Sequence, residues 1–278
     1  MVNPDFAENL PFHHYGLKHR LTAWISIHLF DNVTYTVHRG LLRGMKRKGG
    51  LGWVPESIWP EVKTAEGAFW RRLNLRDLIV YDIGAFHGLL TLFFSLQAKE
   101  VICFEPNTQN HKRLMENLNL NAVRNVKVYK VGVGSRSEKL RMVASPLMPG
   151  GASVNSSIVD RLLRSGIGTV IEEIPIVALD DEIPKAGLPP PVFIKIDIEG
   201  AEIEALKGAR NTLEVYQPTL FLEIHGETVS EKRRKVAEIV ALLWDLNFRN
   251  IRHVESDSMI TPENSSVAME GHLHCWKS

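Results

Sequence analysis

The chain has 278 residues, of which 44% are hydrophobic and 23% are charged. These proportions are ordinary for a globular protein, and the length suits one large α/β domain with an appendage. The formal net charge of +1 excludes a global electrostatic attraction to nucleic acid or to anionic membranes, so any such preference would need a local patch.

Cysteine usage and hydropathy exclude two further classes of protein. Cys103 and Cys275 are the only cysteines, so neither a disulfide framework nor a cysteine-based zinc site is expected. The sequence opens without a signal-peptide pattern and contains no apolar run of about twenty residues. We therefore expect a cytoplasmic protein with no stable membrane insertion.

Residues 1–76 differ in composition from the rest of the chain. They contain scattered histidines, an aromatic-rich stretch over residues 21–30 and the basic, glycine-rich run Arg43–Gly50. The histidines lack the tight spacing of metal ligands. The basic run is more typical of a solvated loop than of an anion site, although its glycines would let backbone N–H groups meet a phosphate. We expect an N-terminal helical cap over residues 1–76, packed on a catalytic domain over 77–278; a lid over the substrate is the alternative.

The most informative segment is residues 81–88, which joins an apolar strand over 78–80 to a helix. Glycines in such a turn let the backbone approach a ligand closely, because they have no Cβ. The helix that follows offers unpaired N–H groups at its start. Glu105 ends the next apolar strand, at the position where a ribose diol is bound in folds of this kind.

The glycine spacing separates two classes of nucleotide cofactor. Dinucleotide enzymes need G-x-G-x-x-G, whereas Gly84 and Gly88 are separated by Ala85-Phe86-His87 and Asp82 precedes them. An acid before the turn would repel a pyrophosphate, but it could hold the ammonium of an amino-acid moiety directly or through water. The pair of Asp82 and Glu105 therefore predicts S-adenosylmethionine rather than NAD as the cofactor.

Strands and helices alternate from residue 78 onward, which is typical of a mostly parallel, doubly wound sheet with right-handed crossovers. We expect further strands over residues 101–104, 126–131, 174–179, 192–197 and 219–225, and a final antiparallel pair near 248–254 and 271–276. The helices between them are expected over residues 108–119, 200–213 and 230–246. The predicted fold class is α/β and Rossmann-like.

The least regular region is residues 135–173. It contains a short predicted strand near 140–143 and a predicted helix around 158–164. Long insertions in compact domains are usually functional loops or lids, so we expect this region to select the substrate. Gly132, just before it, lies at the tip of the third strand, where it could admit an adenine ring edge-on; an ordinary turn is the alternative.

Polar residues also end two later strands, at the edge where open α/β sheets bind their ligands. Lys195 and Asp197 share one side of their strand because side chains alternate along it. A capped helix start explains Glu202, but it does not explain a lysine within an apolar strand, since burying an unpaired ammonium is costly. Glu223 and His225 end the next strand, share a side and should face the cleft beside Asp197.

Four segments together resemble the FkbM family of S-adenosylmethionine-dependent methyltransferases: residues 82–88, 104–107, 194–202 and 222–225. The resemblance covers about residues 78–226. It implies a class I methyltransferase fold with the cofactor across the tips of the first strands. It also implies an enzyme that methylates a hydroxyl of a small molecule, because family members are similar to O-methyltransferases of sugars, polyketides or lipids.

The resemblance implies cofactor contacts in the loops after the first two strands. The predicted cofactor-binding residues are Asp82, Gly84, Ala85, Phe86, His87, Gly88, Glu105, Pro106, Asn107 and Gly132. The chain departs from the family at Phe86 and His87, where Asn and an aliphatic residue are more usual.

The predicted catalytic residues are Asp197, His225, Lys195 and Glu223. Methyl transfer is an in-line displacement at a sulfonium carbon, so the protein mainly holds the acceptor close and aligned. His225 or Asp197 would remove the hydroxyl proton, with Lys195 keeping Asp197 ionised and Glu223 orienting His225. No metal is expected; the alternative is a divalent cation gathered by Asp197, Glu223 and His225.

Rival functions have weaker support in the sequence. A nucleic-acid methyltransferase would show a basic face and an N/D-P-P-aromatic motif after the strand that ends at Asp197, and neither is present. A non-catalytic binding or scaffold protein would be expected to lose Asp82 or Glu105. We therefore expect a small-molecule acceptor and no nucleic-acid partner, whereas the sequence does not indicate the oligomeric state.

Overall fold

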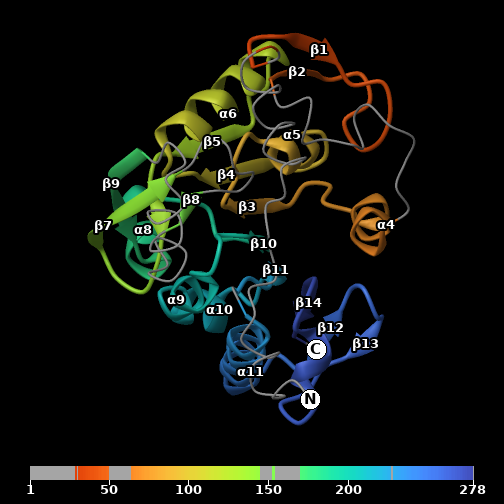
Figure 1. The fold of residues 1–278 in the computed structure, drawn as a ribbon, viewed down its shortest axis with the longest axis vertical. Coiled ribbons are helices and arrows are strands. Elements are labelled where there is room, and N and C mark those ends of the chain that lie inside the picture. The colour runs from red at the N-terminus through yellow and green to blue at the C-terminus, as the bar shows by residue number, and fades with distance from the viewer. Residues whose placement is uncertain are drawn as a thin grey trace, which may run out of the picture.

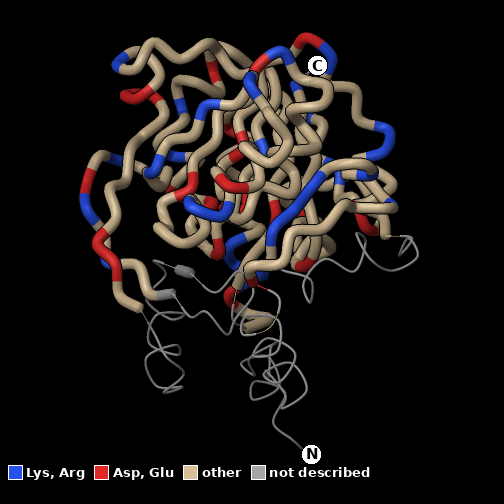
Figure 2. Tube along the Cα trace, turned by 90° about the horizontal axis from the view of Figure 1, so that it is seen from above, with Lys and Arg blue, Asp and Glu red and all other residues tan. Residues whose placement is uncertain are grey.

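The structure is a computed structural model that describes residues 29, 31–49, 64–144, 152–153, 170–226 and 228–277. Its centre is an eight-stranded sheet with helices on both faces, as Figure 1 shows. No helix in the described ranges combines the length and the apolar character needed to cross a bilayer. Lys and Arg alternate with Asp and Glu along the trace in Figure 2, in keeping with the small net charge.

The eight-stranded sheet has the order β13-β12-β14-β11-β10-β3-β4-β5. Its strands are β3 (Ile79–Ile83), β4 (Glu100–Phe104), β5 (Val126–Tyr129), β10 (Phe193–Ile196), β11 (Thr219–Glu223), β12 (Asn250–His253), β13 (Ser258–Met259) and β14 (His272–Trp276). The five strands from β5 to β11 run parallel, and β14 is antiparallel to both β11 and β12. The predicted mostly parallel sheet with a closing antiparallel pair is confirmed.

Two sets of helices cover the two faces of this sheet. One face packs against α4 (Ala65–Arg72), α5 (Leu89–Ser95) and α6 (Thr108–Leu120). The other packs against α8 (Leu179–Ala186), α9 (Glu202–Lys207), α10 (Arg210–Val215) and α11 (Val229–Asp245), with the 3₁₀ helix η3 (Ser265–Ala268) beside them. The layered arrangement is the predicted doubly wound α/β fold.

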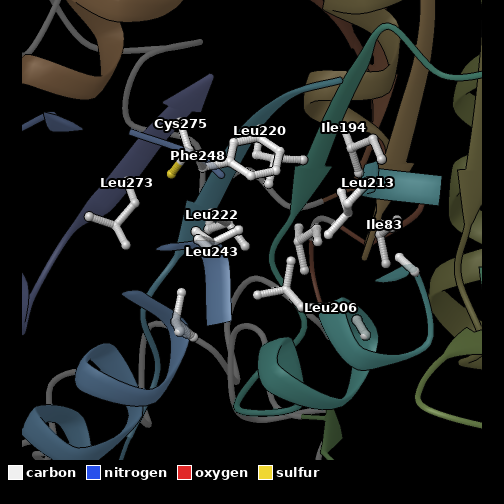
Figure 3. Close-up of a cluster of buried hydrophobic side chains, with 14 of the residues drawn as sticks. Ile83, Ile194, Leu206, Leu213, Leu220, Leu222, Leu243, Phe248, Leu273 and Cys275 are labelled. Atoms are coloured by element: carbon white, nitrogen blue, oxygen red, sulfur yellow. The ribbon is translucent and has the colours of Figure 1, made fainter. Parts of the chain in front are cut away.

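Alternation along each central strand supplies both cores. In β4, Val101 and Cys103 face α5 and α6, whereas Ile102 and Phe104 face the opposite helices. Strands buried on both faces read as continuous apolar runs in the sequence. Figure 3 shows one core, in which sheet residues such as Ile194 and Leu222 lie among helix residues such as Leu206, Leu213 and Leu243.

The predicted helix over residues 200–213 is divided into α9 and α10 at Gly208. A Cβ built on Gly208 would lie only 1.9 Å from the carbonyl oxygen of Gly134. This close approach of two backbones needs a glycine.

The strand predicted over residues 174–179 differs most from expectation. It is β9 (Val170–Val177), and it lies in a separate four-stranded sheet with β6 (Gly132–Val133), β7 (Glu138–Ala144) and β8 (Ala152–Ser153), in the order β6-β9-β7-β8. The predicted strand over 126–131 likewise ends at Tyr129, and the chain then enters this second sheet. The helix predicted around 158–164 lies outside the described residues.

The described part of residues 1–76 is a hairpin of β1 (Thr34–Thr36) and β2 (Lys46–Lys48), followed after a gap by α4. The rest of the predicted helical cap lies outside the described residues. The basic run is only in part the solvated loop that we expected. Arg43, Gly44 and Lys46 are exposed, but residues 46–48 form β2 and the side chain of Arg47 is only 2% exposed. The cause is packing against α6, where Asn117 accepts a hydrogen bond from the backbone N–H of Lys48 at 2.8 Å.

Candidate active site

A cavity of about 250 Å³ opens where β3, β4 and β10 end, against the second sheet. Half of the predicted cofactor residues line it: Gly84, Phe86, Glu105, Pro106 and Gly132. Three of the four predicted catalytic residues line it as well: Asp197, Glu223 and His225. The two predicted constellations therefore share one cavity at the carboxyl edge of the sheet.

The turn after β3 forms the floor of the cavity and depends on glycine. Gly84 has a left-handed φ of 81°, and a Cβ there would lie 1.9 Å from the carbonyl oxygen of Asp197. Gly88, with φ of 83°, is the N-cap of α5, and its Cβ would lie 2.4 Å from Leu114 Cδ1. Larger residues at either position would meet both backbone strain and a clash.

Glu105 follows β4 and lies at the cavity wall with 5% exposure. Its carboxylate accepts hydrogen bonds from the backbone N–H groups of Phe86 at 2.8 Å and Asn107 at 2.9 Å. Burial raises the pKa of Glu105 to about 7, although these two hydrogen bonds and Asn110 act in the opposite direction. The acid is thus oriented by the loop that it stabilises.

The other predicted cofactor residues lie behind the cavity surface: Asp82, Ala85, His87, Gly88 and Asn107. Asn107 is the N-cap of α6, and its side chain accepts from Gln109 N and Asn110 N. The ring of His87 stacks on Phe86 with centroids 3.8 Å apart.

Asp82 is fully buried beneath the turn. Its Oδ2 accepts a hydrogen bond from Thr91 Oγ1 at 2.6 Å, and its Oδ1 lies 3.4 Å from Lys195 Nζ. Lys195 Nζ also lies 3.1 Å from Asp197 Oδ2 and donates to the carbonyl oxygen of Gly84 at 2.7 Å. The lysine within the apolar strand is therefore paired, and it joins the β3 acid to the cavity acid.

Charge pairing sets the ionisation of this group. Burial alone would lower the pKa of Lys195, but Asp197 and Asp82 raise it well above its usual value. Burial would likewise raise the pKa of Asp197, whereas Lys195 and His225 bring it below its usual range. Lys195 and Asp197 are accordingly both charged at neutral pH.

His225 lies at the centre of a ring of carboxylates. Its Nδ1 is 2.8 Å from Glu202 Oε1, a buried side chain. Its Nε2 faces Asp197 Oδ1 at 3.6 Å, Glu223 Oε1 at 3.5 Å and Glu199 Oε2 at 3.9 Å. Burial would lower the pKa of His225, but the hydrogen bond to Glu202 and the surrounding acids raise it to about 10. The imidazole is therefore protonated at neutral pH.

The same group has the spacing of a cation site. Asp197, Glu223 and His225 each place one candidate ligand atom within 4.8 Å of the others. Carboxylate oxygens and an imidazole nitrogen are ligands that several divalent metals accept.

Several cavity residues were not predicted from the sequence. For Glu199 the sequence left a helix cap and a site role equally open; it lines the cavity, and burial raises its pKa to about 7. Asn110 lies one helical turn after the Asn107 cap, and that helix start was the available signal for it. Ile174 and Ile176 alternate on β9 and, with Met142, form an apolar wall. No sequence signal pointed to this wall, because the pairing of β9 with β7 is not visible in the sequence.

The family follows from a comparison with known protein families. Residues 82–250, which are more than half of the chain, match the family model described as the methyltransferase FkbM domain. The chain belongs to the FkbM methyltransferase family. The matched segment contains both groups of cavity residues, from Gly84 to His225, and reaches β12.

Curated relatives of this FkbM-family chain are distant in sequence. The chain is 29% identical over 151 residues to the hexuronic acid methyltransferase AglP of Haloferax volcanii, covering 54% of this chain and 57% of that protein. It is 24% identical over 147 residues to methyltransferase 1 of Beauveria bassiana, covering 48% of this chain and 58% of that protein. The chain thus spans less than two thirds of the length of these curated relatives.

Solved structures of similar proteins are also distant in sequence. The crystal structure of the methyltransferase FkbM from Methylobacillus flagellatus KT has 20% identity and a TM-score of 0.45, covering 74% of this chain and 44% of that chain. SMU.1697c of Streptococcus mutans, a methyltransferase solved in complex with SAH, has 12% identity and a TM-score of 0.44, covering 78% of this chain and all of that chain.

Proposed function

We propose that this FkbM-family protein transfers the methyl group of S-adenosylmethionine to a hydroxyl oxygen of a small molecule. One observation carries the proposal: the glycine turn with Glu105 and the group of Asp197, Glu223 and His225 line a single cavity. A donor molecule held at the first end would meet an acceptor held at the second. Such juxtaposition is the main contribution a protein makes to a displacement reaction.

The chemistry of the first end fits an adenosyl amino acid. Glu105 offers carboxylate oxygens to a ribose diol, and Asn110 lies beside it on the cavity wall. The apolar wall of Met142, Ile174 and Ile176 suits a flat base, which gains from burial against aliphatic side chains. When bound, S-adenosylmethionine supplies an electrophilic methyl group on a sulfonium.

The charge of the cavity also fits a cationic cofactor. Asp197, Glu199 and Glu223 line it together with Glu105. A sulfonium and an ammonium are both attracted by such a concentration of acids. Asp82 does not reach the cavity, so we propose that it acts indirectly, by holding Lys195 under the turn.

A carboxylate is the better candidate for the base. His225 is already protonated at neutral pH because of its acidic neighbours, so it would hold the acceptor oxygen as a hydrogen-bond donor. We propose that Asp197 accepts the hydroxyl proton, with Lys195 positioning it. Glu199 is the alternative base, since its pKa of about 7 suits proton transfer at neutral pH.

The acceptor class is proposed from a relative. The Haloferax volcanii protein is named for hexuronic acid, so sugars are the first acceptors to test. Methyl transfer from labelled S-adenosylmethionine to a panel of sugars and uronic acids would identify the acceptor, with each product's methylated oxygen located by mass spectrometry.

The decisive experiment separates binding from chemistry. Calorimetry with S-adenosylhomocysteine and with NADH should show binding of the first compound only. Asp197→Asn should lower kcat by about 10²- to 10⁴-fold with little change in S-adenosylhomocysteine affinity, whereas Glu204→Gln, on the exposed side of α9, should change neither. Full activity of Asp197→Asn together with loss of activity in Glu199→Gln would show that Glu199 is the base. If the protein binds neither S-adenosylhomocysteine nor NADH, the proposal is refuted.

A metal-assisted form of the same reaction is a second candidate, favoured by the spacing of Asp197, Glu223 and His225. A divalent cation there would polarise the acceptor hydroxyl. Activity that is unchanged after exhaustive chelation would exclude it.

A further inference from the structure

Arg47 in β2 is a buried guanidinium that the proposed reaction does not use. It is 2% exposed, and its Nε and Nη1 atoms are buried without a hydrogen-bond acceptor in the part of the chain that the structure describes. Tyr35 is its cross-strand partner in β1, and the Tyr35 hydroxyl is also buried and without a partner. Unsatisfied groups of this kind are rare in folded proteins, and an ion that completes them is one standard explanation.

The acids nearest to this hairpin are already paired with other cations. Arg113 in α6 contacts Asp31 through Nη2 at 2.7 Å and Glu116 through Nη1 at 3.2 Å. Lys48 Nζ lies 3.3 Å from the same Glu116. Arg113 and Lys48 therefore pair with these two acids, whereas the charge of Arg47 has no counter-charge among the described residues.

The surroundings of Arg47 have a positive potential. Burial lowers the pKa of the Arg47 guanidinium, and the charge of Arg113 acts in the same direction. Burial, followed by the charges of Arg47 and Arg113, lowers the pKa of His87 to about 3, so His87 adds no charge at neutral pH. A water molecule could satisfy single N–H groups, but it could not neutralise a buried cation.

We propose that Arg47, with Arg113 and the Tyr35 hydroxyl, binds a compact oxyanion, a carboxylate or a phosphate group, beside the turn that ends at Gly88. A guanidinium binds such groups by charge-assisted hydrogen bonds, which are about twice as strong as neutral ones. None of these three residues is among those that line the methyl-transfer cavity.

Two sources supply this chemistry: a free or acceptor-borne anion, or the carboxylate of the cofactor's amino-acid moiety. The second source alone depends on the proposed function. Thermal melts in sodium phosphate against sodium chloride of equal ionic strength test the first source. Calorimetry with S-adenosylhomocysteine and with 5′-methylthioadenosine, which lacks the amino acid, tests the second.

The variant for both arms is Arg47→Met, and the control is Lys46→Met, at the exposed neighbouring position of β2. For a free anion, phosphate should raise the melting temperature of the wild type and of Lys46→Met, and the phosphate Kd should rise by about tenfold or more in Arg47→Met. If the anion is the cofactor carboxylate, Arg47→Met should weaken the binding of S-adenosylhomocysteine by a similar factor. The affinity for 5′-methylthioadenosine should stay unchanged.

Stability in the absence of anion separates binding from a merely structural role. Arg47→Met should melt no lower than the wild type in chloride, because it removes an unpaired buried charge and retains an apolar side chain. Arg47→Lys provides a second variant that keeps the charge and should show a partial loss of anion binding. The proposal is overturned if Arg47→Met responds to phosphate and binds S-adenosylhomocysteine as the wild type does.

Discussion

Lys195 lies between two carboxylates and one backbone carbonyl, and this position organises the active-site end of the cavity. Its ammonium is within 3.4 Å of Asp82 Oδ1, 3.1 Å of Asp197 Oδ2 and 2.7 Å of the Gly84 carbonyl oxygen. Breaking a buried ion pair by removing one partner is far more damaging than removing both, because it leaves an uncompensated charge.

Lys195→Met should therefore lower the free energy of unfolding by about 3–5 kcal/mol. The double variant Lys195→Met/Asp82→Asn should recover part of this loss, since one orphaned acid is neutralised. Chemical denaturation of the wild type and both variants measures the effect. Equal stability of Lys195→Met and the wild type would contradict the pairing described for this lysine.

If Glu105 binds the ribose as we propose, cofactor affinity should depend on pH. Its pKa is raised from 4.5 to about 7 in the ligand-free protein, chiefly by burial, so the carboxyl is neutral below this pH and ionised above it. The ionised form accepts hydrogen bonds from a ribose diol, so affinity for S-adenosylhomocysteine should increase as the pH rises through about 7 and level off above it. The groups facing Glu105 are the N–H groups of Phe86 and Asn107, the Asn110 amide and, at longer range, Lys195, and none of them titrates in this window.

Calorimetry between about pH 5.5 and 8.5 would measure this dependence, with a slope of at most one decade of Kd per pH unit on the acid side. Glu105→Gln cannot ionise at this position, so its binding should be weaker at high pH and should keep only the dependence that Glu199, whose pKa is also about 7, contributes from the same cavity. A wild-type affinity that is constant with pH would show that Glu105 does not bind the ribose.

Single positions in the site were predictable where strand alternation decides the geometry. Alternation places Lys195 beside Asp197, and it brings Glu223 and His225 to the same edge. It does not reveal that Asp82 lies under the turn, because that depends on Thr91 and Lys195 approaching from two other elements. The carboxylate ring around His225 was also not predicted, since Glu202 had been assigned only to a helix start.

At the scale of elements, α6 connects the N-terminal hairpin to the cofactor turn. Asn117 accepts from Lys48 N at 2.8 Å and donates to the carbonyl oxygen of His87 at 2.8 Å. Of the hairpin and the turn, Asn121 bonds the hairpin only. It accepts from Lys46 N and donates to the carbonyl oxygen of Lys46, both at 2.7 Å. Asn121 is therefore a control for Asn117, because both bond the hairpin but Asn117 also bonds the turn.

Asn117→Ala should destabilise the protein by about 1–3 kcal/mol and also weaken S-adenosylhomocysteine binding, because the turn loses its support at His87. Asn121→Ala should destabilise the hairpin without changing cofactor affinity. Hydrogen exchange over residues 84–88 measures the difference directly. Faster exchange of this segment in both variants alike would contradict a specific role for Asn117.

The strands of the central sheet and their mostly parallel direction were predictable, whereas the second sheet was not. Apolar runs ending in polar residues identify β3, β4, β10 and β11, and the parallel order follows from the helices between them. The sequence of β9 shows a strand but not its partner, because β7 and β9 pair by backbone hydrogen bonds that carry no residue code. Within the basic run, the burial of Arg47 was not predicted because it depends on α6, which is far along the chain.

At the scale of the whole molecule, α4 links the N-terminal region to the catalytic core. Trp70 is 2% exposed, and its ring lies 4.2 Å from that of Phe221 in β11 and 5.6 Å from that of Phe94 in α5. A domain boundary at residue 76 would therefore separate an aromatic core residue from its neighbours.

Trp70→Ala should lower the free energy of unfolding by about 3–5 kcal/mol. Val267→Ala, at a position that is 49% exposed, should have little effect and serves as the control. Urea denaturation of both variants is the measurement. A loss below about 1 kcal/mol for Trp70→Ala would indicate that α4 is an independent appendage rather than part of the core.

The contact between Gly84 and Asp197 has a mechanical consequence. A Cβ at 84 would lie 1.9 Å from the carbonyl oxygen of Asp197, and Asp197 N donates to the carbonyl oxygen of Ile83 at 3.1 Å. No side chain separates the two backbones, so a shift of either one must displace the other. The glycine turn and the Asp197 backbone consequently move as a single body, so in the proposed reaction the distance between donor and acceptor would stay constant.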